Sequence, residues 1–298
     1  MSKYVDPLTD FSFKRLFGVE PNKDLLIDFL NAVFQGRKSI VDLVYNKNES
    51  VGDRELVGSV IFDLQCTAAD GSIFLIEVQR TDQHNLKQRM LYYGSKLIAD
   101  QAPKGKRSSW NYAISEVYIV VLMDGFRLGD AAGTNYLHHV SLCCEETSSI
   151  FYEGLSFVYI ELINFDKKEV DLQCDLDKWL YVLRHMSKMN KLPVYLNKTI
   201  FKKLFQIAAY SKMTKEECAM YDNSLKRKWD AYNIQESARL DGIAIGVEEG
   251  IAIGVEEGKA IGVEEGKRSL ASALKAKNFS ASLIAEVTGL SLDEIELI

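Results

Sequence analysis

The sequence predicts an α/β fold, in which helices cover a sheet and further helices follow it along the chain. Two observations carry this prediction. Short β-rich runs alternate with amphipathic helical segments up to about residue 165, as expected for strands and helices layered around one core. Beyond that point the pattern is mainly helical. Apolar residues make up 47% of the 298 positions and charged residues 26%, which is ordinary for a folded protein.

Each element has its own sequence signal. Asn22 precedes an apolar stripe that is typical of an amphipathic helix with a capping residue at its start. The run 115–123 is the most apolar strand and should lie centrally in the sheet. In chain order we expect a helix at 22–33, a strand at 40–45, strands at 59–67 and 72–80, a helix at 84–100, a strand at 115–123, β-rich segments within 136–163 and helices from 178 onward.

The acidic tail contains an internal repeat. From Gly242 the sequence reads GIAIGVEE, GIAIGVEE and GKAIGVEE, with glycine at every fourth position up to Gly266. On a helix these glycines form a slowly drifting stripe, but each costs a lone helix roughly 0.8–1 kcal/mol relative to alanine. The repeat is either a flexible acidic linker or a helix whose glycine stripe packs against a partner helix. We expect the second, and with it a homo-oligomer formed through the repeat.

The segment after the repeat predicts a small helical module. Two short helices are expected at 269–277 and 282–288, followed by a turn and the segment 292–298. The last segment carries acidic residues and no lysine or arginine, so it has the wrong sign for reading DNA. We therefore expect four parts: a core at 1–165, a helical extension at 166–240, the repeat at 241–268 as helix or linker, and a helical module at 269–298.

Composition indicates a cytoplasmic protein with no membrane segment. The first residues are charged where a secretory signal needs an apolar stretch. Five cysteines, an odd number, fit reduced thiols better than a disulfide framework. The segment 236–298 has 12 acidic and 6 basic residues, so 30 of the 42 acidic and 30 of the 36 basic residues remain in the body. Nucleic acid would then need a local basic face, for which the strings 104–107 and 226–228 are the best candidates.

Two carboxylates in the expected strands at 59–67 and 72–80 are the strongest sign of a functional site. The strands read VIFDLQC and IFLIEVQR, so Asp63 and Glu77 interrupt runs that are otherwise apolar. Residues in such runs are usually buried, and an unpaired buried charge is costly. Something must compensate the two negative charges.

The length of the connecting loop decides how the two carboxylates are placed. With Gly71 in the left-handed conformation, a three-residue loop pairs Ala68 with Ser72. Counting back along both strands, Asp63 falls opposite Glu77 on one face, with Cβ atoms roughly 4.5–5.5 Å apart. A two-residue turn would put them on opposite faces. Two anions this close require a cation between them, and oxygen ligands suit Mg²⁺.

An amide follows on the same face. Gln79 lies two residues after Glu77, where it could hydrogen-bond a water at the site. The alternative is that Asp63 and Glu77 are separate charges of an edge strand, either solvated or paired with Arg80 or Arg89.

Three strings resemble a known nuclease family. They read IFDLQCTAADGSIFLIEVQR, DPLTDFSFKRLFG and QRMLYYGSKL. Together they are similar to the PD-(D/E)XK nuclease superfamily, and more closely to the Rpn family of recombination-promoting nucleases, whose members are also described as transposases. The resemblance covers most of the chain. It implies a restriction-endonuclease-like αβββαβ core with a helical C-terminal extension and a glycine-rich repeat helix.

The resemblance also implies roles for the hairpin residues. Asp63, Glu77 and the backbone carbonyl of Val78 would hold Mg²⁺ or another divalent cation such as Mn²⁺. Gln79 would act with Asp63 and Glu77 in catalysis, at a position where the wider superfamily has lysine and the Rpn-like group has E-x-Q. A neutral amide orients water by hydrogen bonds only, which leaves the activation of water mostly to the metal.

Four further residues are candidate supporting groups. The resemblance points to Asp10 and Lys14, which share one face if 11–17 is helical. Lys14 is a candidate partner for a phosphate or carboxylate, and the alternative is a surface ion pair. Arg89 and Tyr93 follow on the next helix and could contact the substrate backbone.

Three functions are consistent with these residues. The leading hypothesis is a Mg²⁺-dependent DNA endonuclease linked to recombination or transposition. The second is a catalytically weak or inactive nuclease-fold protein that binds DNA or organises an assembly. The third is a protein-interaction module, which predicts no salt-dependent binding of DNA.

Overall fold

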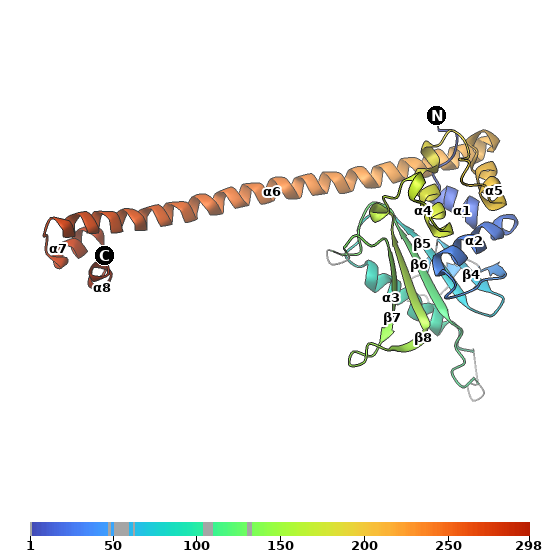
Figure 1. Ribbon diagram of the computed structural model, residues 1–298, viewed down its shortest axis with the longest axis horizontal. Coiled ribbons are helices and arrows are strands. Elements are labelled where there is room, and N and C mark those ends of the chain that lie inside the picture. Colours follow the sequence, from blue (N-terminus) through green and yellow to red (C-terminus); the bar gives the residue numbers. More distant parts are fainter. Residues whose placement is uncertain (1, 47–48, 51–59, 62, 104–109, 130–132) are drawn as a thin grey trace. The chain divides into compact units, whose positions relative to one another are not determined.

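The computed structural model describes residues 2–46, 49–50, 60–61, 63–103, 110–129 and 133–298 (Figure 1). The chain divides into two compact units, Met1–Asn233 and Ile234–Ile298. The first contains the sheet and the helices that cover it, and the second contains the end of one long helix and two short helices. The four-part division of the chain stays a prediction.

A six-stranded mixed sheet lies at the centre of the first unit, in the order β1-β4-β5-β6-β8-β7. Its strands are β1 (Leu43–Tyr45), β4 (Leu64–Ala68), β5 (Ile73–Gln79), β6 (Val117–Met123), β7 (Leu137–Cys143) and β8 (Ile150–Glu161). β6 is parallel to β5 and β8, and the other pairs are antiparallel. β2 (Glu49–Ser50) and β3 (Val60–Ile61) pair separately. The central position predicted for the most apolar strand is confirmed, because β6 has a neighbouring strand on each side.

Helices cover both faces of the sheet (Figure 1). One core includes residues from α1 (Asp10–Phe17), α2 (Lys23–Phe34), α4 (Asp175–His185) and α5 (Thr199–Ala208), and the opposite core includes α3 (Leu86–Ala99). Alternation along β6 explains the two cores, since Val120 belongs to the first and Val121 to the second. Short 3₁₀ turns lie at Glu20–Asn22, Leu162–Asn164, Glu169–Asp171, Met186–Lys188 and Tyr210–Lys212.

Asn22 has a different role from the predicted one. It precedes α2, but its side chain makes no capping hydrogen bond to that helix. The amide instead donates to the backbone carbonyl of Arg15 at 3.0 Å. The residue therefore ties the start of α2 to α1.

A cluster of aromatic side chains holds α1 in place. The Trp179 ring of α4 is fully buried, and its centroid lies 5.8 Å from that of Phe17, 5.7 Å from that of Phe29 and 5.0 Å from that of Phe201. The indole Nε1 donates to Asp28 Oδ1 at 2.7 Å, so the polar end of the ring is also satisfied. The four rings come from α1, α2, α4 and α5, and they fix these helices to one another.

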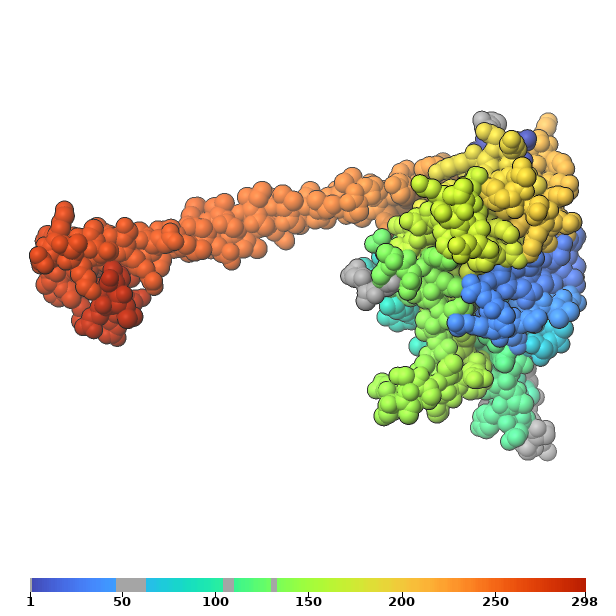
Figure 2. Space-filling view, viewed as in Figure 1, coloured from blue at the N-terminus to red at the C-terminus, as the bar shows by residue number. Residues whose placement is uncertain are grey.

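The β7–β8 hairpin projects from the first unit in light green (Figure 2). Ile150 and Phe151, at the start of β8, are 53% and 81% exposed. Further along β8, Val158 and Ile160 are fully buried in the core. Only the inner part of this hairpin therefore contributes to the core.

The repeat lies within α6 (Lys215–Ala276), a single helix of 62 residues. At each of the glycines from Gly242 to Gly266, a methyl group in place of the Cα hydrogen would meet no atom within 4 Å. Within the described part of the chain, nothing therefore packs against the glycine stripe. Self-association through the repeat stays a prediction. None of the described helices combines the length and the apolar character needed to cross a bilayer.

One element after the repeat differs from its prediction. Residues 269–276 do not form a separate helix but continue α6, which ends only where Asn278 adopts a φ of +61°. α7 (Ala281–Thr288) and α8 (Leu292–Glu296) follow. They pack on the end of α6 through a small core of four buried residues, which are Ala271, Ile284, Leu290 and Ile295.

The aromatic cluster yields a first prediction. We expect Trp179→Ala to lower the free energy of unfolding by roughly 3–5 kcal/mol, because it empties a fully buried site and leaves three rings without their neighbour. Trp229, which is 59% exposed, supplies the control, since Trp229→Ala should change stability by less than about 0.5 kcal/mol. Urea denaturation measures both values. Equal losses in the two variants would contradict the assignment of the cluster.

Candidate functional site

The β4–β5 hairpin has the predicted register. β4 pairs antiparallel with β5 from Leu64 opposite Ile76 to Thr67 opposite Ile73. The Ala68 N–H donates to the Ser72 carbonyl at 2.8 Å, which closes a three-residue loop. Gly71 has a φ of +88°, a value that glycine adopts without steric cost.

Asp63 lies in a bend directly before β4, so the predicted strand 59–67 is not continuous, but its hydrogen bonds bring it next to Glu77 as predicted. The backbone N–H of Asp63 donates to Glu77 Oε1 at 3.2 Å, and the N–H of Val78 donates to Asp63 Oδ2 at 2.8 Å. Gln79 Nε2 donates to Glu77 Oε2 at 3.0 Å, because residues two apart on a strand share a face. The structure therefore gathers all four hairpin residues, while their catalytic roles stay a prediction.

Burial sets the electrostatics of the pair. Glu77 is only 5% exposed. Burial, and next the negative charge of Asp63, raise the pKa of Glu77 to about 7. Burial also raises the pKa of Asp63, against the hydrogen bond from Val78. The alternative of two separate solvated charges is thus excluded for Glu77, and the pair would gain from a nearby cation.

The donors at this site fit a hard divalent cation. Asp63 and Glu77 offer carboxylate oxygens, the type of ligand that Mg²⁺ and Mn²⁺ prefer. The Val78 N–H points toward β4, and the carbonyl of a strand residue lies on the same side as its N–H, so a third oxygen faces the same edge. Among the described residues no group of three or more His, Cys, Asp or Glu side chains is arranged to hold a metal. A cation here would depend on two carboxylates, a backbone carbonyl and water.

Asp10 and Lys14 lie on α1, near Asp63. Thr9 caps this helix, since its side-chain oxygen accepts from the Ser12 N–H. Lys14 Nζ lies 2.9 Å from Asp10 Oδ1, so the two form the i,i+4 ion pair that the alternative interpretation foresaw. After burial and the Val78 hydrogen bond, the charges of Lys14 and Asp10 act next on the pKa of Asp63, the first lowering and the second raising it. The ion pair therefore borders the acidic pair.

Arg89 and Tyr93 approach the pair from α3. The guanidinium of Arg89 lies 5.9 Å from the centroid of the Tyr93 ring, and its Nη1 donates to Gln83 Oε1. Its Nε and Nη2 atoms are buried without a hydrogen-bond partner among the described residues, a costly state for a charged donor. Among the causes that set the pKa of Glu77, after burial and Asp63, the Arg89 charge lowers it. Arg89 thus has two N–H donors without an acceptor among the described residues, and its charge acts on Glu77.

Contacts between distant parts of the chain tie the N-terminal segment to β5 and α6. Arg80 Nε donates to the Leu8 carbonyl at 2.9 Å, which joins β5 to the N-terminal segment. On α6, Lys228 Nζ lies 2.9 Å from Asp6 Oδ2 and 2.7 Å from Asp124 Oδ2. The sequence carries no sign of this network, because 222 residues separate Asp6 from Lys228 and no local pattern joins them.

The two basic strings have different outcomes. The string 104–107 lies outside the described residues. In the string 226–228, Lys226 and Arg227 are exposed, whereas Lys228 is engaged by its two carboxylates. Lys228 is therefore a structural anchor for α6 rather than a free cation for phosphate contacts.

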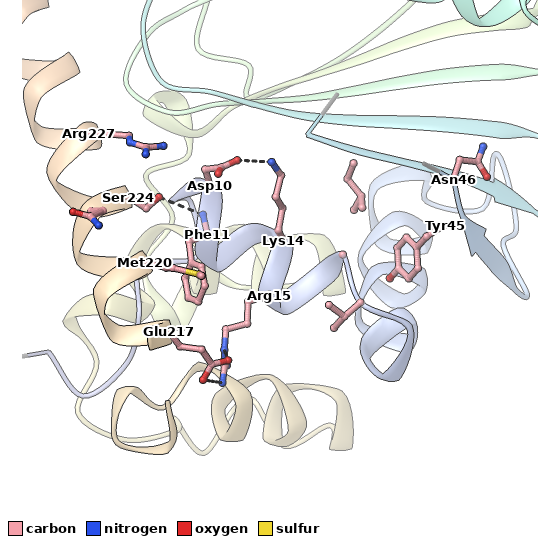
Figure 3. A pocket seen from close by; sticks show the side chains of 14 residues that line it. Asp10, Phe11, Lys14, Arg15, Tyr45, Asn46, Glu217, Met220, Ser224 and Arg227 are labelled. Atoms are coloured by element: carbon pink, nitrogen blue, oxygen red, sulfur yellow. Dashed lines mark hydrogen bonds and ion pairs between the residues drawn. The ribbon is translucent and has the colours of Figure 1, made fainter. Parts of the chain in front are cut away.

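A pocket of about 980 Å³ opens beside α1 (Figure 3). α1 forms its floor, and the start of α6 and the ends of β1 and β4 form its walls. Its lining comprises Asp10, Phe11, Lys14, Arg15, Gly18, Val19, Tyr45, Asn46, Leu64, Glu217, Met220, Asn223, Ser224 and Arg227. Leu64 is the chain neighbour of Asp63, so the pocket reaches the residue next to the acidic pair, although Asp63 and Glu77 do not line it.

Comparison with known proteins gives one match. The model of a family described as PD-(D/E)XK nuclease family transposase matches residues 7–238. The matched range includes the hairpin with its acidic pair, α1 to α5 and the first part of α6. No curated protein and no solved structure matches the chain.

The raised pKa of Glu77 predicts a pH dependence of stability. Its pKa lies at about 7 in the folded protein, against 4.5 for a glutamate in water. The folded state therefore favours protonated Glu77. The contribution of Glu77 to the free energy of unfolding is fully present below about pH 4.5 and is lost as the pH rises through 7. In chelator, we expect Glu77→Gln to gain on the order of 2 kcal/mol over the native protein between pH 5 and pH 8.

Asp70 of the same hairpin provides the matched control. Its pKa is lowered to about 2, first by the hydrogen bond from Lys38, so its stabilising effect is lost only as the pH falls toward 2. Asp70→Asn should therefore change stability equally at pH 5 and pH 8. Urea denaturation at both pH values tests this, and a Glu77→Gln effect that does not vary with pH would refute the electrostatic assignment.

Proposed function

The chain belongs to the PD-(D/E)XK nuclease family transposases, and from this premise we propose that it is a divalent-metal-dependent DNA endonuclease that hydrolyses phosphodiester bonds. The single observation that carries the proposal is the buried pair of Asp63 and Glu77, joined by the hydrogen bond from the Asp63 N–H to Glu77 Oε1. A pair of buried carboxylates at the end of a hairpin is costly without a cation. Binding of Mg²⁺ or Mn²⁺ beside a phosphate would explain why the two carboxylates are buried together.

The order of elements supports a restriction-endonuclease-like core. α2, β1, β4, β5, α3 and β6 follow one another as α, β, β, β, α and β, apart from the short β2 and β3. Asp63 directly precedes β4, Glu77 lies near the end of β5, and α3 is the next helix along the chain. This order agrees with the αβββαβ core that the resemblance implied.

In the proposed mechanism, Asp63, Glu77 and the carbonyl of Val78 would hold the cation. When bound, it would supply Lewis-acid stabilisation of charge on the phosphate and make water more acidic. The hydrogen bonds from Val78 and Gln79 hold the two carboxylates in place before substrate arrives. Such preorganisation removes the need to rearrange them during the reaction.

Gln79 orients the attacking water in this proposal. Its Nε2 is committed to Glu77 Oε2 at 3.0 Å, so its carbonyl oxygen is the atom that remains to accept a hydrogen bond from water. The amide adds no charge at the position where the wider superfamily has lysine. Positive charge must therefore come from the metal, from Arg89 and from Lys14.

Arg89 is the proposed phosphate contact, with Tyr93 beside it. The Nε and Nη2 atoms lie on one edge of the guanidinium, and no described residue accepts a hydrogen bond from them. Two N–H groups in this arrangement match two phosphate oxygens. A phosphate near Glu77 would satisfy both donors.

The family description supports a role in recombination or transposition, and the repeat in α6 supports assembly into a homo-oligomer. The alternative function is a weak or inactive nuclease fold that binds DNA or organises an assembly. The neutral side chain of Gln79 supports this alternative, because it supplies no positive charge to the reaction. DNA binding with no cleavage under any divalent cation would favour this alternative.

Loss of a carboxylate tests the proposed activity. We expect the purified protein to nick supercoiled plasmid in Mg²⁺ or Mn²⁺, and Glu77→Gln and Asp63→Asn to lower the rate by on the order of 10²-fold or more, because each removes a charged metal ligand. Asp70→Asn changes a carboxylate at the other end of the same hairpin and should keep the native rate. Full activity of Glu77→Gln would overturn the assignment.

A second prediction concerns Arg89. We expect Arg89→Gln to raise the KM for DNA and to lower the cleavage rate roughly 10- to 100-fold, with Arg89→Lys in between, because lysine keeps the charge but not the two-pronged geometry. Lys87 lies on the same helix and is exposed, so Lys87→Gln is the control for loss of a charge. Identical kinetics for the Arg89 and Lys87 variants would show that Arg89 acts only through long-range charge.

A further inference from the structure

The pocket beside α1 is lined by apolar and aromatic side chains as well as by charged ones. Phe11 lies on its floor, Met220 on the wall formed by α6, and Tyr45 on the wall formed by β1 (Figure 3). Met220 is 59% exposed, and Figure 3 shows it beside the Phe11 ring, with Tyr45 at the opposite end of the pocket. Flat apolar surfaces of this kind are suited to stacking on a base.

Polar groups stand around these apolar side chains. Asn223 and Arg227 lie on α6 beside Met220 and line the same pocket. Within the described residues, Arg227 makes no ion pair or hydrogen bond, whereas Lys14 and Arg15 are paired with Asp10 and Glu217. Figure 3 shows Arg227 extending from α6 toward α1. Its charge is available to a phosphate at the rim of the pocket.

The position of the pocket links it to the acidic pair. Leu64, the chain neighbour of Asp63, lines the pocket, and Asp10 and Lys14 line it from α1. A nucleic-acid strand with a phosphate at the carboxylates would therefore bring a neighbouring nucleotide to the mouth of the pocket. A base stacked within a regular duplex could not enter it, because its partner strand and its neighbours hold it in the helix.

We propose that this pocket binds the base of an unpaired nucleotide next to the scissile phosphate, and that the substrate is DNA with a locally unpaired or distorted site. The proposal rests on the proposed endonuclease function for the location of the scissile phosphate. It assigns Phe11 and Met220 to the faces of the base, and Asn223 and Arg227 to its polar edge and phosphate. A mismatched or unpaired base costs least to extrude, which selects such sites over regular duplex.

Binding in the absence of metal tests the pocket separately from cleavage. Two short duplexes of the same sequence are compared in chelator, one fully paired with 2-aminopurine opposite thymine and one with the same 2-aminopurine as a single-nucleotide bulge. We expect the full-length protein to bind the bulged duplex roughly tenfold more tightly, the gain of stacking one base on protein side chains. The 2-aminopurine emission of the bulged duplex should change on binding, since the base leaves the DNA stack.

Neighbouring residues on α6 give a matched pair of variants. Met220→Asp puts a carboxylate and a smaller side chain into the pocket. It should abolish the preference, so that the bulged and the paired duplex bind with about equal affinity. Ala219 is exposed and does not line the pocket, so Ala219→Asp adds the same charge one position away and should keep the preference. Circular dichroism of both variants checks that the fold is retained.

The outcomes separate the two proposals. Equal affinity of the native protein for both duplexes would overturn the base pocket and indicate contacts to the backbone alone. Equal loss of preference in Met220→Asp and Ala219→Asp would overturn it as well, because added charge would then explain the effect. Preference for the bulge without cleavage in any divalent cation would leave the pocket standing and refute the endonuclease.

Discussion

The burial of two carboxylates in one hairpin is the constraint on which the site depends. Asp63 and Glu77 face each other only because a three-residue loop with Gly71 at a positive φ sets the register, and a shift by one residue would separate them. Backbone N–H groups and the Gln79 amide hold both carboxylates, but these donors do not offset two buried negative charges. The pKa of Glu77, raised to about 7 chiefly by burial, reflects that imbalance. In the proposed function, a divalent cation would offset the negative charge of the pair.

The rest of the first unit brings further groups to this hairpin from distant parts of the chain. The rings around Trp179 fix α1, and α1 in turn carries Lys14 to the neighbourhood of Asp63. The first turns of α6 hold the same helix from the other side, through the hydrogen bond from the Phe11 N–H to Ser224 Oγ and the Arg15–Glu217 ion pair. α6 therefore belongs to the candidate site as much as to the tail.

The sequence is sufficient for the parts of the site that local geometry determines. Strand alternation and loop length predict the contact of Asp63 with Glu77 and the place of Gln79, because all three depend on residues within one hairpin. Contacts across more than 200 residues leave no local signal, so the sequence offers the string 226–228 for DNA contacts without revealing that Asp6 anchors Lys228. The pocket has no local signal either, since its walls are joined only in the folded chain.

The neutral amide at Gln79 is consistent with these surroundings. A lysine there would place a permanent positive charge beside Glu77, lower the pKa of the pair and compete with a cation for the same oxygens. Gln79 instead donates one neutral hydrogen bond to Glu77, so position 79 adds no positive charge to the pair. The positive charges that act on the pair then come from neighbouring helices, from Arg89 on α3 and Lys14 on α1. In the proposed function the carboxylates would hold the metal and Arg89 would contact the phosphate, and hydrolysis of a phosphodiester needs both roles.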